Sequence, residues 1–598
     1  MSTVPAPASA PPVSSRRRNV LPWLLVAGYA AQVAVRLWLA RARVWPAAEP
    51  DETGYLVAAR WLAGGPAADM SGNTFYQGGY SLLLVPAYWL TDDPVNVYTL
   101  AIAINAVIGA AAFPLGYLAL RRLGMRRRPA LPAAWAAALL PAATFFGSYA
   151  LTDAVLPVLV LAWLLALDRC TRDERPGAPV LASLSAAYAH TMHSRGTVLL
   201  AVHLLTLAFL LWRRLMPWQV SRRAAPDRIA GTRPDARERS GLLPRWRAGV
   251  GPVLAGVLVT GAGCAAGAML NARVRSALYP RGTRDLTANI VERVTTLEGQ
   301  AWALSGTAGQ IWYLVVGTWG LAGIGLAATV AVVVRRRVEP ETRLMALVLL
   351  VTTCGIAYAA SAALPDEHRV GNFAYGRYLS CVALAYTLAG LAALARRGTV
   401  WLGAGAAGTV VTTGAWVRGY AGERLRTHLY IGFDFPETSF LAADRTAFHL
   451  GRASLVALGL LAGFLVLRRL GALAVAAGLV AVNLAAMTFI VGLDQRRARP
   501  APVLPGPAAG GVALDRSLFW VVPVRLTYAV WWTRMTWIST RTERPAPGVC
   551  TVVVPLPAGT SVQDSWPGRP PGWRPYVGHA WTTPWVAWQD PACPATGG

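Results

Sequence analysis

The sequence predicts an all-α, multi-span integral membrane protein with about 13 transmembrane helices and a small α/β domain at its C-terminus. Hydrophobic residues make up 55% of the 598 residues and charged residues only 14%, whereas a soluble globular chain carries about 25% charged residues. The mean hydropathy is +0.41. Apolar runs of about 20 residues, long enough to cross a bilayer as helices, recur along the chain. These features exclude a disordered protein and disfavour an ordinary cytosolic enzyme.

The charge of the chain indicates membrane orientation. The net charge is +27, and all 56 basic residues are arginine. A nucleic-acid-binding protein gathers its basic residues into one patch, but here the arginines separate the apolar runs. We therefore expect no nucleic-acid partner.

Thirteen spans with approximate edges are predicted from the apolar runs. The span at 178–193 is the weakest, because it contains Ser, Tyr and two His. The spans cover residues 20–40, 95–120, 129–147, 152–168, 178–193, 196–212, 249–270, 310–334, 342–363, 376–395, 399–416, 452–467 and 471–492.

The arginines orient these spans. With the N-terminal segment 1–19 in the cytoplasm, every arginine-rich short loop falls on the inner side, as the positive-inside rule requires. These clusters lie at 16–18, 121–128, 169–175, 213–248, 335–343, 396–397 and 468–469. The odd number of spans then places the C-terminus outside. The first apolar run, of about 20 residues, is longer than the core of a signal peptide, so we expect an uncleaved span and a multi-pass protein of the cell membrane.

The chain divides into a transmembrane domain, 20–492, and an extracytoplasmic C-terminal domain, 500–598. The longest outer segments are 41–94, 271–309 and 417–451. The inner loop 213–248 is rich in Arg, Pro and Gly and is expected to be a flexible linker. A second linker, rich in Ala, Pro and Gly, occupies 498–511.

The C-terminal domain has a weak α/β pattern. Short strands are expected at 512–514, 549–554 and 585–588, with a helix at 523–540. Its many tryptophans favour core packing or membrane-surface contact over stacking on sugars. Cys550 and Cys593 are expected to form a disulfide, since an extracytoplasmic location permits one, and the alternative is two unpaired buried thiols.

Two glycine patterns imitate nucleotide-binding loops. Residues 403–408 match G-x-G-x-x-G, and residues 261–266 match the variant that ends in Ala. Both patterns lie inside predicted spans and lack the strand–turn–helix context of a nucleotide site. We interpret them as small residues that let membrane helices pack closely.

The strongest site signal follows the first span, where Pro50 precedes Asp51 and Glu52. Two adjacent carboxylates at the outer membrane face can supply a general base or ligands for a divalent cation. The alternative is a solvated helix start, since acidic residues after Pro suit a first turn.

Further polar residues lie at the same predicted depth. A carboxylate or guanidinium at a span end is costly unless it is paired or faces a cavity. Together they suit a cavity that holds a phosphate and a hydroxyl, because Arg grips phosphate oxygens and a carboxylate takes up a proton. The alternative for each single arginine is snorkelling to the interface. These residues are Arg36, Asp153, His193, Arg195, Tyr375 and Arg377.

Five segments resemble the GT-C glycosyltransferases, in the group that contains the protein O-mannosyltransferases and the lipid A aminoarabinose transferase. They are PDETGY at 50–55, GYLVAARWLAG at 54–64, LTD at 151–153, HSRG at 193–196 and YGRY at 375–378. The resemblance is best over 45–200 and is not evident in the C-terminal domain. One departure is that 76–80 reads YQGGY, where related enzymes often carry a Pro-Pro pair.

The resemblance implies an inverting transfer of a hexosyl or pentosyl group from a polyprenyl-phosphate donor to a cell-envelope glycan, lipid or protein. It implies that Asp51 and Glu52 are catalytic, with Asp51 as the base that deprotonates the acceptor. Glu52 and Asp153 would orient the acceptor or share a divalent cation, although neither the metal nor any other cofactor is identified. Arg36, Arg195 and Arg377 would stabilise the leaving phosphate. Tyr55, His193 and Tyr375 complete the expected substrate-binding set.

Two other functions are compatible with the sequence. A transporter or flippase of a lipid-linked glycan would also line a cavity with acids and arginines, but such proteins often show inverted repeats, which this chain does not display. A non-catalytic scaffold would leave the acidic loop unexplained. The sugar and the acceptor stay open.

Overall fold

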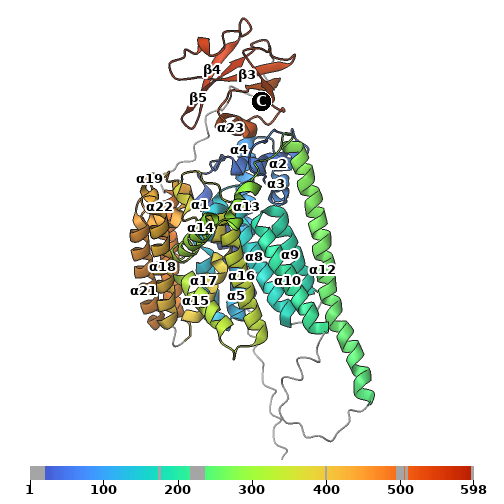
Figure 1. Ribbon diagram of the computed structural model, residues 1–598, viewed down its shortest axis with the longest axis vertical. Coiled ribbons are helices and arrows are strands. Elements are labelled where there is room, and N and C mark those ends of the chain that lie inside the picture. The colour runs from blue at the N-terminus through green and yellow to red at the C-terminus, as the bar shows by residue number, and fades with distance from the viewer. Residues whose placement is uncertain are drawn as a thin grey trace, which may run out of the picture.

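The computed structural model describes residues 20–172, 177–215, 236–396, 400–492, 504 and 510–593, and for 236–249 only the helical backbone. A body of packed helices carries a small domain with a β-sheet at one end (Figure 1). The predicted segment 1–19 and most of the predicted linkers 213–248 and 498–511 lie outside the described residues. The last part of 213–248, from Ala236, belongs to a long helix.

The helical body follows the chain in order. Its first half contains α1 (Leu21–Ala40), α2 (Asp51–Leu62), α3 (Gly78–Leu90), α4 (Pro94–Ala110), α5 (Ala112–Arg122), α6 (Arg127–Ala138), α7 (Pro141–Thr144), η1 (Phe146–Ser148), η2 (Thr152–Ala154), α8 (Leu156–Arg172), α9 (Gly177–Met192), α10 (Arg195–Leu215) and α12 (Ala236–Leu278). Its second half contains α13 (Thr287–Thr295), α14 (Leu297–Val316), α15 (Leu321–Val334), α16 (Pro340–Ala363), η3 (Val370–Asn372), η4 (Arg377–Leu379), α17 (Ser380–Leu394), α18 (Val400–Ala421), α19 (Arg424–Thr427), η5 (Gly432–Asp434), α20 (Pro436–Ala442), α21 (Leu450–Leu467), η6 (Arg468–Leu470) and α22 (Ala472–Val491).

Within the described ranges, nine helices are long and apolar enough to cross a membrane, or up to eleven if each of two bent helix pairs counts as one span. These nine helices and two bent pairs account for eleven of the thirteen predicted stretches. The other two stretches, 152–168 and 178–193, fall on α8 and α9, which are 17 and 16 residues long.

One predicted span has a different shape. The stretch 310–334 is not a straight helix, because α14 and α15 meet at a bend of 115°. Trp319 and Gly320 have φ values of 60° and 82° at this bend. Gly320 also packs against Leu461, so a Cβ there would lie 2.8 Å from that side chain. This left-handed conformation favours glycine, so Gly320 permits the bend between α14 and α15.

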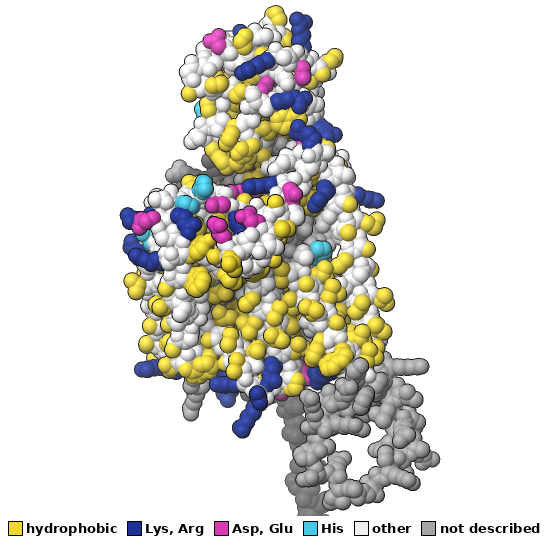
Figure 2. Space-filling model, in the orientation of Figure 1, with side chains coloured by type: hydrophobic (Ala, Val, Ile, Leu, Met, Phe, Trp, Pro, Cys, Tyr) yellow, Lys and Arg dark blue, Asp and Glu magenta, His cyan; other side chains and the backbone are white. Residues whose placement is uncertain are grey.

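The outer surface of the helical body is apolar around its middle. Figure 2 shows hydrophobic side chains covering this zone, with arginines gathered at its two ends. Large side chains such as Trp23, Leu205, Leu258 and Leu455 are each about 70% exposed. An apolar belt of this extent suits lipid rather than water. The protein is therefore a multi-pass membrane protein.

Glycines let the helices of the body approach closely. A Cβ on Gly325 of α15 would lie 1.9 Å from the carbonyl oxygen of Tyr386 in α17. The two glycine patterns of the sequence lie inside α12 and α18, where Gly263 packs against Ala187 and Gly403 against Leu465. This arrangement agrees with the helix-packing interpretation.

The C-terminal domain contains one helix, α23 (Val521–Ala529), and a five-stranded sheet in the order β2-β1-β3-β5-β4. β1 pairs in parallel with β2 and β3, while β5 pairs antiparallel with β3 and β4. A disulfide joins Cys550 in β3 to Cys593. The strands are β1 (Gly511–Asp515), β2 (Thr536–Ile538), β3 (Val549–Pro555), β4 (Arg574–Ala580) and β5 (Thr583–Gln589).

The three predicted strands of this domain are present as β1, β3 and β5. The predicted helix at 523–540 is wrong beyond Ala529, since the following residues turn back and form β2 beside β1. β-branched Thr536 and Ile538 flank Trp537 there, and strand pairing overrides the helical pattern.

The C-terminal domain rests on the segment between α1 and α4. The buried guanidinium of Arg60 in α2 donates from Nη1 to the carbonyl oxygens of Thr527 (3.1 Å) and Val530 (3.0 Å) at the end of α23. The hydroxyl of Tyr528 donates to the carbonyl of Pro94 at 2.6 Å, and its ring packs edge-on against Trp45. These contacts fix α23 against α2 and the start of α4.

We expect Arg60→Ala to loosen this contact. The change leaves two buried carbonyl oxygens without their donor, at a cost of about 1–3 kcal/mol. Trypsin should then release a C-terminal fragment faster than from the wild type. Arg574→Ala, which removes an exposed arginine of β4, is the matched control. Equal release rates for all three proteins would show that Arg60 does not hold the domain.

Candidate functional site

The site lies where the first turn of α2, η2, η4 and the start of α10 converge. Asp51 is the first residue of α2, after Pro50, so its carboxylate sits at a helix N-terminus, where a negative charge is stabilised by the helix dipole. Asp153 lies in η2, just before α8. The two carboxylates come from separate parts of the chain and face one guanidinium.

That guanidinium belongs to Arg377, the first residue of η4. Its Nη1 donates to Oδ2 of Asp51 at 2.8 Å, and its Nε donates to Oδ2 of Asp153 at 2.9 Å. The rings of Phe146 and Phe433 lie 5.9 and 6.0 Å from its centre. Arg377 therefore holds two acidic residues together in a largely apolar surrounding.

Arg195, the first residue of α10, extends the network. Its Nη2 lies 2.7 Å from Oδ1 of Asp153, and its Nη1 donates to the carbonyl oxygen of Arg377 at 3.2 Å. His193 contacts the same arginine, with its Nδ1 accepting from the Arg195 backbone N–H at 3.1 Å. Burial and the neighbouring Arg195 hold the pKa of His193 well below its usual value, so the ring is a neutral acceptor.

Solvent access distinguishes the two carboxylates. The side chain of Asp51 is 31% exposed, whereas that of Asp153 is fully buried and that of Arg377 is 10% exposed. Asp51 can meet an incoming group, whereas Asp153 can only fix the arginines. The arrangement thus offers one accessible proton acceptor beside one guanidinium that can bind an anion.

The YQGGY segment at 76–80, which stands where related enzymes often carry a Pro-Pro pair, contributes directly to this site. The hydroxyl of Tyr76 donates to Oδ1 of Asp51 at 3.0 Å. Burial and the nearby Asp51 raise the pKa of Tyr76 well above its usual value, so it stays a donor. Tyr55 packs edge-on against both Tyr76 and Tyr80. Gly54 permits this, because a Cβ there would lie 2.0 Å from the ring of Tyr76.

The structure places Glu52 in a different role from Asp51. Its carboxylate is buried and accepts four hydrogen bonds of 2.6–2.7 Å. The donors are the backbone N–H groups of Ala47, Ala48 and Ala150 and the hydroxyl of Tyr98. Glu52 joins the segment between α1 and α4 to the chain before η2, and its hydrogen bonds do not reach the network of Arg377.

Arg36 also lies apart from this network. Its Nη1 and Nη2 donate to the carbonyl oxygens of Ala143 (2.7 Å) and Ala138 (2.8 Å). Glu52 and Asp153, which by the resemblance would orient the acceptor or share a divalent cation, have different partners: four hydrogen-bond donors surround Glu52, and two guanidiniums surround Asp153. A cation beside Asp153 would also meet the charges of two arginines.

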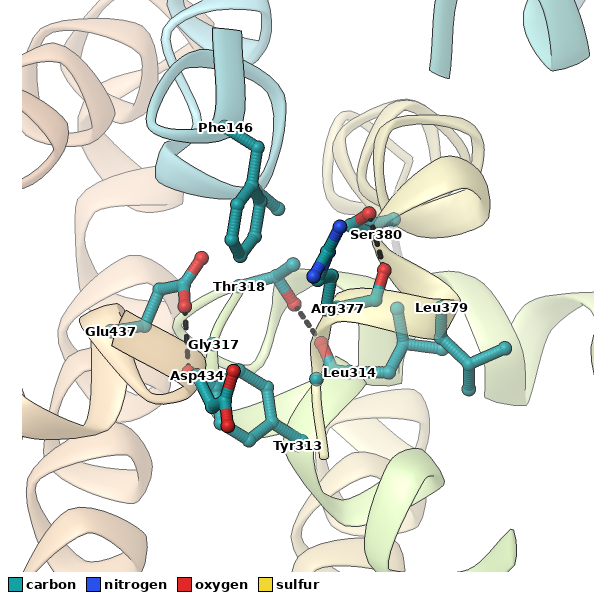
Figure 3. Close-up of a pocket in the computed structure, with 13 residues that line it drawn as sticks. Phe146, Tyr313, Leu314, Gly317, Thr318, Arg377, Leu379, Ser380, Asp434 and Glu437 are labelled. Carbon is teal, nitrogen blue, oxygen red and sulfur yellow. Dashed lines mark hydrogen bonds between the residues drawn. The ribbon is translucent and has the colours of Figure 1, made fainter. Parts of the chain in front are cut away.

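A small pocket lies next to Arg377. Figure 3 shows Phe146, Arg377, Asp434 and Glu437 pointing into the same space. Tyr375 lies just outside its lining, with its ring 4.6 Å from that of Tyr378. The pocket is lined by Ala142, Phe146, Tyr313, Leu314, Gly317, Thr318, Gly376, Arg377, Leu379, Ser380, Ala383, Asp434 and Glu437.

The sequence analysis missed two acidic residues of this pocket, Asp434 and Glu437. Burial raises the pKa of Asp434 to about 6 and that of Glu437 to about 7. The hydroxyl of Tyr313 donates to Oε2 of Glu437 at 2.8 Å. The sequence held a signal for them, since these acids flank Pro436 in a segment between two apolar runs, much as Asp51 and Glu52 follow Pro50.

Comparisons with known proteins place two solved structures beside this chain. No family model matches it, and no curated protein matches it in sequence. The crystal structure of ArnT from Cupriavidus metallidurans in the apo state aligns with a TM-score of 0.46 and 14% identity, over 95% of this chain and 98% of that one. The cryo-EM structure of arabinosyltransferase EmbB from Mycobacterium smegmatis aligns with a TM-score of 0.40 and 16% identity, over 81% of this chain and 42% of that one.

The raised pKa values predict a pH dependence of stability. Between about pH 4.5 and pH 7, folded Glu437 keeps a proton that the unfolded chain releases, so the free energy of unfolding falls as pH rises. One such group contributes about 3 kcal/mol over this window. Glu437→Gln should flatten the curve of melting temperature against pH between pH 4.5 and pH 8. Glu423→Gln, at an exposed position, should leave the curve unchanged, and a wild-type slope in Glu437→Gln would contradict the assignment.

Proposed function

We propose that the protein is a GT-C-type membrane glycosyltransferase that works at the outer membrane face. It transfers a hexosyl or pentosyl group from a polyprenyl-phosphate donor to a hydroxyl of a cell-envelope acceptor, by a single inverting displacement. The observation that carries this proposal is the network in which Arg377 joins the partly exposed Asp51 to the buried Asp153 beside a pocket.

In this proposal Asp51 is the base. The acceptor hydroxyl must lose its proton as it attacks the sugar, and a general base must lie within hydrogen-bond reach of it. Asp51 is the accessible carboxylate of the network, and Arg377 and Tyr76 fix its two oxygens. Its orientation is therefore set before the acceptor arrives.

Arg377 receives the leaving group. The phosphate gains negative charge as the glycosidic bond breaks, and a guanidinium already in place stabilises that charge. The hydrogen bonds of Arg377 to the described residues use Nε and Nη1, so Nη2 is left to contact a phosphate oxygen. Arg195 acts as a positioning residue, because it binds Asp153 and the backbone of Arg377.

The proposed topology has thirteen spans. It counts the nine long apolar helices, the two bent pairs, α8 and α9. The N-terminus lies in the cytoplasm, and the domain at 500–598 lies outside the cell membrane. This orientation brings Asp51 and the C-terminal domain to the same outer face.

We expect Asp51→Asn to reduce sugar transfer by at least about 100-fold, the lower bound for loss of a general base. Donor binding should not weaken, because Arg377 keeps its ion pair with Asp153. The measurement is transfer from a polyprenyl-phosphate sugar by the purified protein in detergent, together with donor affinity.

Asp69→Asn is the matched control for this experiment. Asp69 lies in the same outer segment and pairs with Arg281 at 2.7 Å, outside the network. Transfer by Asp51→Asn at the rate of Asp69→Asn would reject Asp51 as the base. If the wild type moves a lipid-linked sugar across the bilayer yet never cleaves it from its phosphate, a flippase replaces the enzyme.

Labelling of engineered cysteines tests the proposed topology. In a background without Cys170, Cys264, Cys354 and Cys381, a membrane-impermeant maleimide should label Ser561→Cys in intact cells. A cysteine placed in 213–248 should react only after the cells are opened. Labelling of the inner site in intact cells would overturn the orientation.

A further inference from the structure

Two histidines and an aspartate lie together in loops that the reaction does not use. Asp366 and His368 follow α16, and His428 follows α19. One possible ligand atom from each residue lies within 4.8 Å of the others. Among the described residues, this is the one group of three or more His, Cys, Asp or Glu side chains with such spacing.

The backbone holds the two histidines side by side. The N–H of Leu429 donates to the carbonyl oxygen of His368 at 2.9 Å, and the N–H of Val370 donates to that of Leu429 at 3.0 Å. The two imidazole centroids are 5.6 Å apart. Because main-chain hydrogen bonds join these two loops, the fold itself keeps the two imidazoles close together.

We propose that Asp366, His368 and His428 bind a divalent transition-metal ion of the zinc class, with a water molecule as the fourth ligand. Two imidazoles and one carboxylate suit Zn²⁺, whereas Ca²⁺ and Mg²⁺ prefer oxygen ligands throughout. This proposal does not rest on the proposed function.

The ligand atoms of the three side chains need to approach one another only slightly to bind a tetrahedral ion. Ligand atoms around tetrahedral zinc lie about 3.4 Å apart when the metal–ligand distances are about 2.1 Å. Oδ1 of Asp366 already lies 3.4 Å from Nδ1 of His368. The side chains of Asp366 and His368 are 41% and 82% exposed, so both can rotate to complete the site.

The surroundings leave one ring nitrogen of His428 available and limit repulsion of a cation. The hydroxyl of Thr427 lies 3.5 Å from Nδ1 of His428, a contact that leaves Nε2 for the metal. The nearby guanidiniums of Arg284 and Arg369 both pair with Glu367, at 2.9 and 2.7 Å. Their charges are therefore partly balanced before an ion binds.

A bound ion would fasten two loops that lead into the pocket. His368 precedes Arg377 by nine residues, and His428 precedes Asp434 by six. The ion would link the two segments beside the site and fix their relative positions. It would take no part in the bond-breaking step.

Zinc binding by the purified, untagged full-length protein tests the proposal. After equilibrium dialysis against ZnCl₂ in a zinc buffer, the wild type should retain one zinc per chain. His368→Ala and His428→Ala should each weaken the affinity by at least about tenfold. Zinc should raise the melting temperature of the wild type and not of these variants.

His449→Ala is the matched control. His449 contacts Asp444 at 2.8 Å but belongs to no described group of three ligands, so its loss should not change zinc retention. His368 is exposed and His428 is half-buried, and unchanged melting temperatures without zinc will show that the variants fold. Failure of the wild type to retain zinc, or wild-type affinity in both variants, would overturn the proposal.

Discussion

The ion pairs of Arg377 are the interaction on which the candidate site and the segments around it depend. One guanidinium neutralises Asp51 of α2 and Asp153 of η2, while Arg195 of α10 secures the second carboxylate. Removing one member of a buried pair costs about 3–5 kcal/mol, since a charge is left without its partner. Four segments that are distant in sequence must therefore meet in one arrangement. The same requirement leaves Asp51 as the one carboxylate of the network open to a reaction partner.

The sequence predicted the helical body well because bilayer-spanning helices need long apolar runs, and such runs are visible without tertiary information. It failed where tertiary contacts decide. The stretch 310–334 is apolar throughout, yet Gly320 allows the sharp bend between α14 and α15. The helix expected at 523–540 ends at Ala529, because Thr536–Ile538 pairs with β1. Neither outcome can be read from hydropathy, which does not report which segments become neighbours.

The candidate site was partly predictable for a related reason. Asp153, Arg195 and Arg377 stand out because charges at span ends need partners or a cavity, and the structure brings them to Asp51. Glu52 is adjacent to Asp51 but points away from the network, because one step along a helix turns a side chain by about 100°. The sequence alone does not show which of the two carboxylates faces the site. Other pocket residues, which include Tyr313, Asp434 and Glu437, come from segments that only the fold brings together.

The contact of Arg60 with α23 has a consequence for how the protein is made. Arg60 and Thr527 are 467 residues apart, and a ribosome adds about 5–20 residues per second. The carbonyl oxygens that accept from Arg60 are therefore synthesised only near the end of translation, long after Arg60 itself. The helix that begins at Asp51 gains its final support only when the last segment of the chain has folded. A truncated chain would lack the two hydrogen bonds of Arg60 to α23, so its α2 would be held less firmly than in the full-length protein.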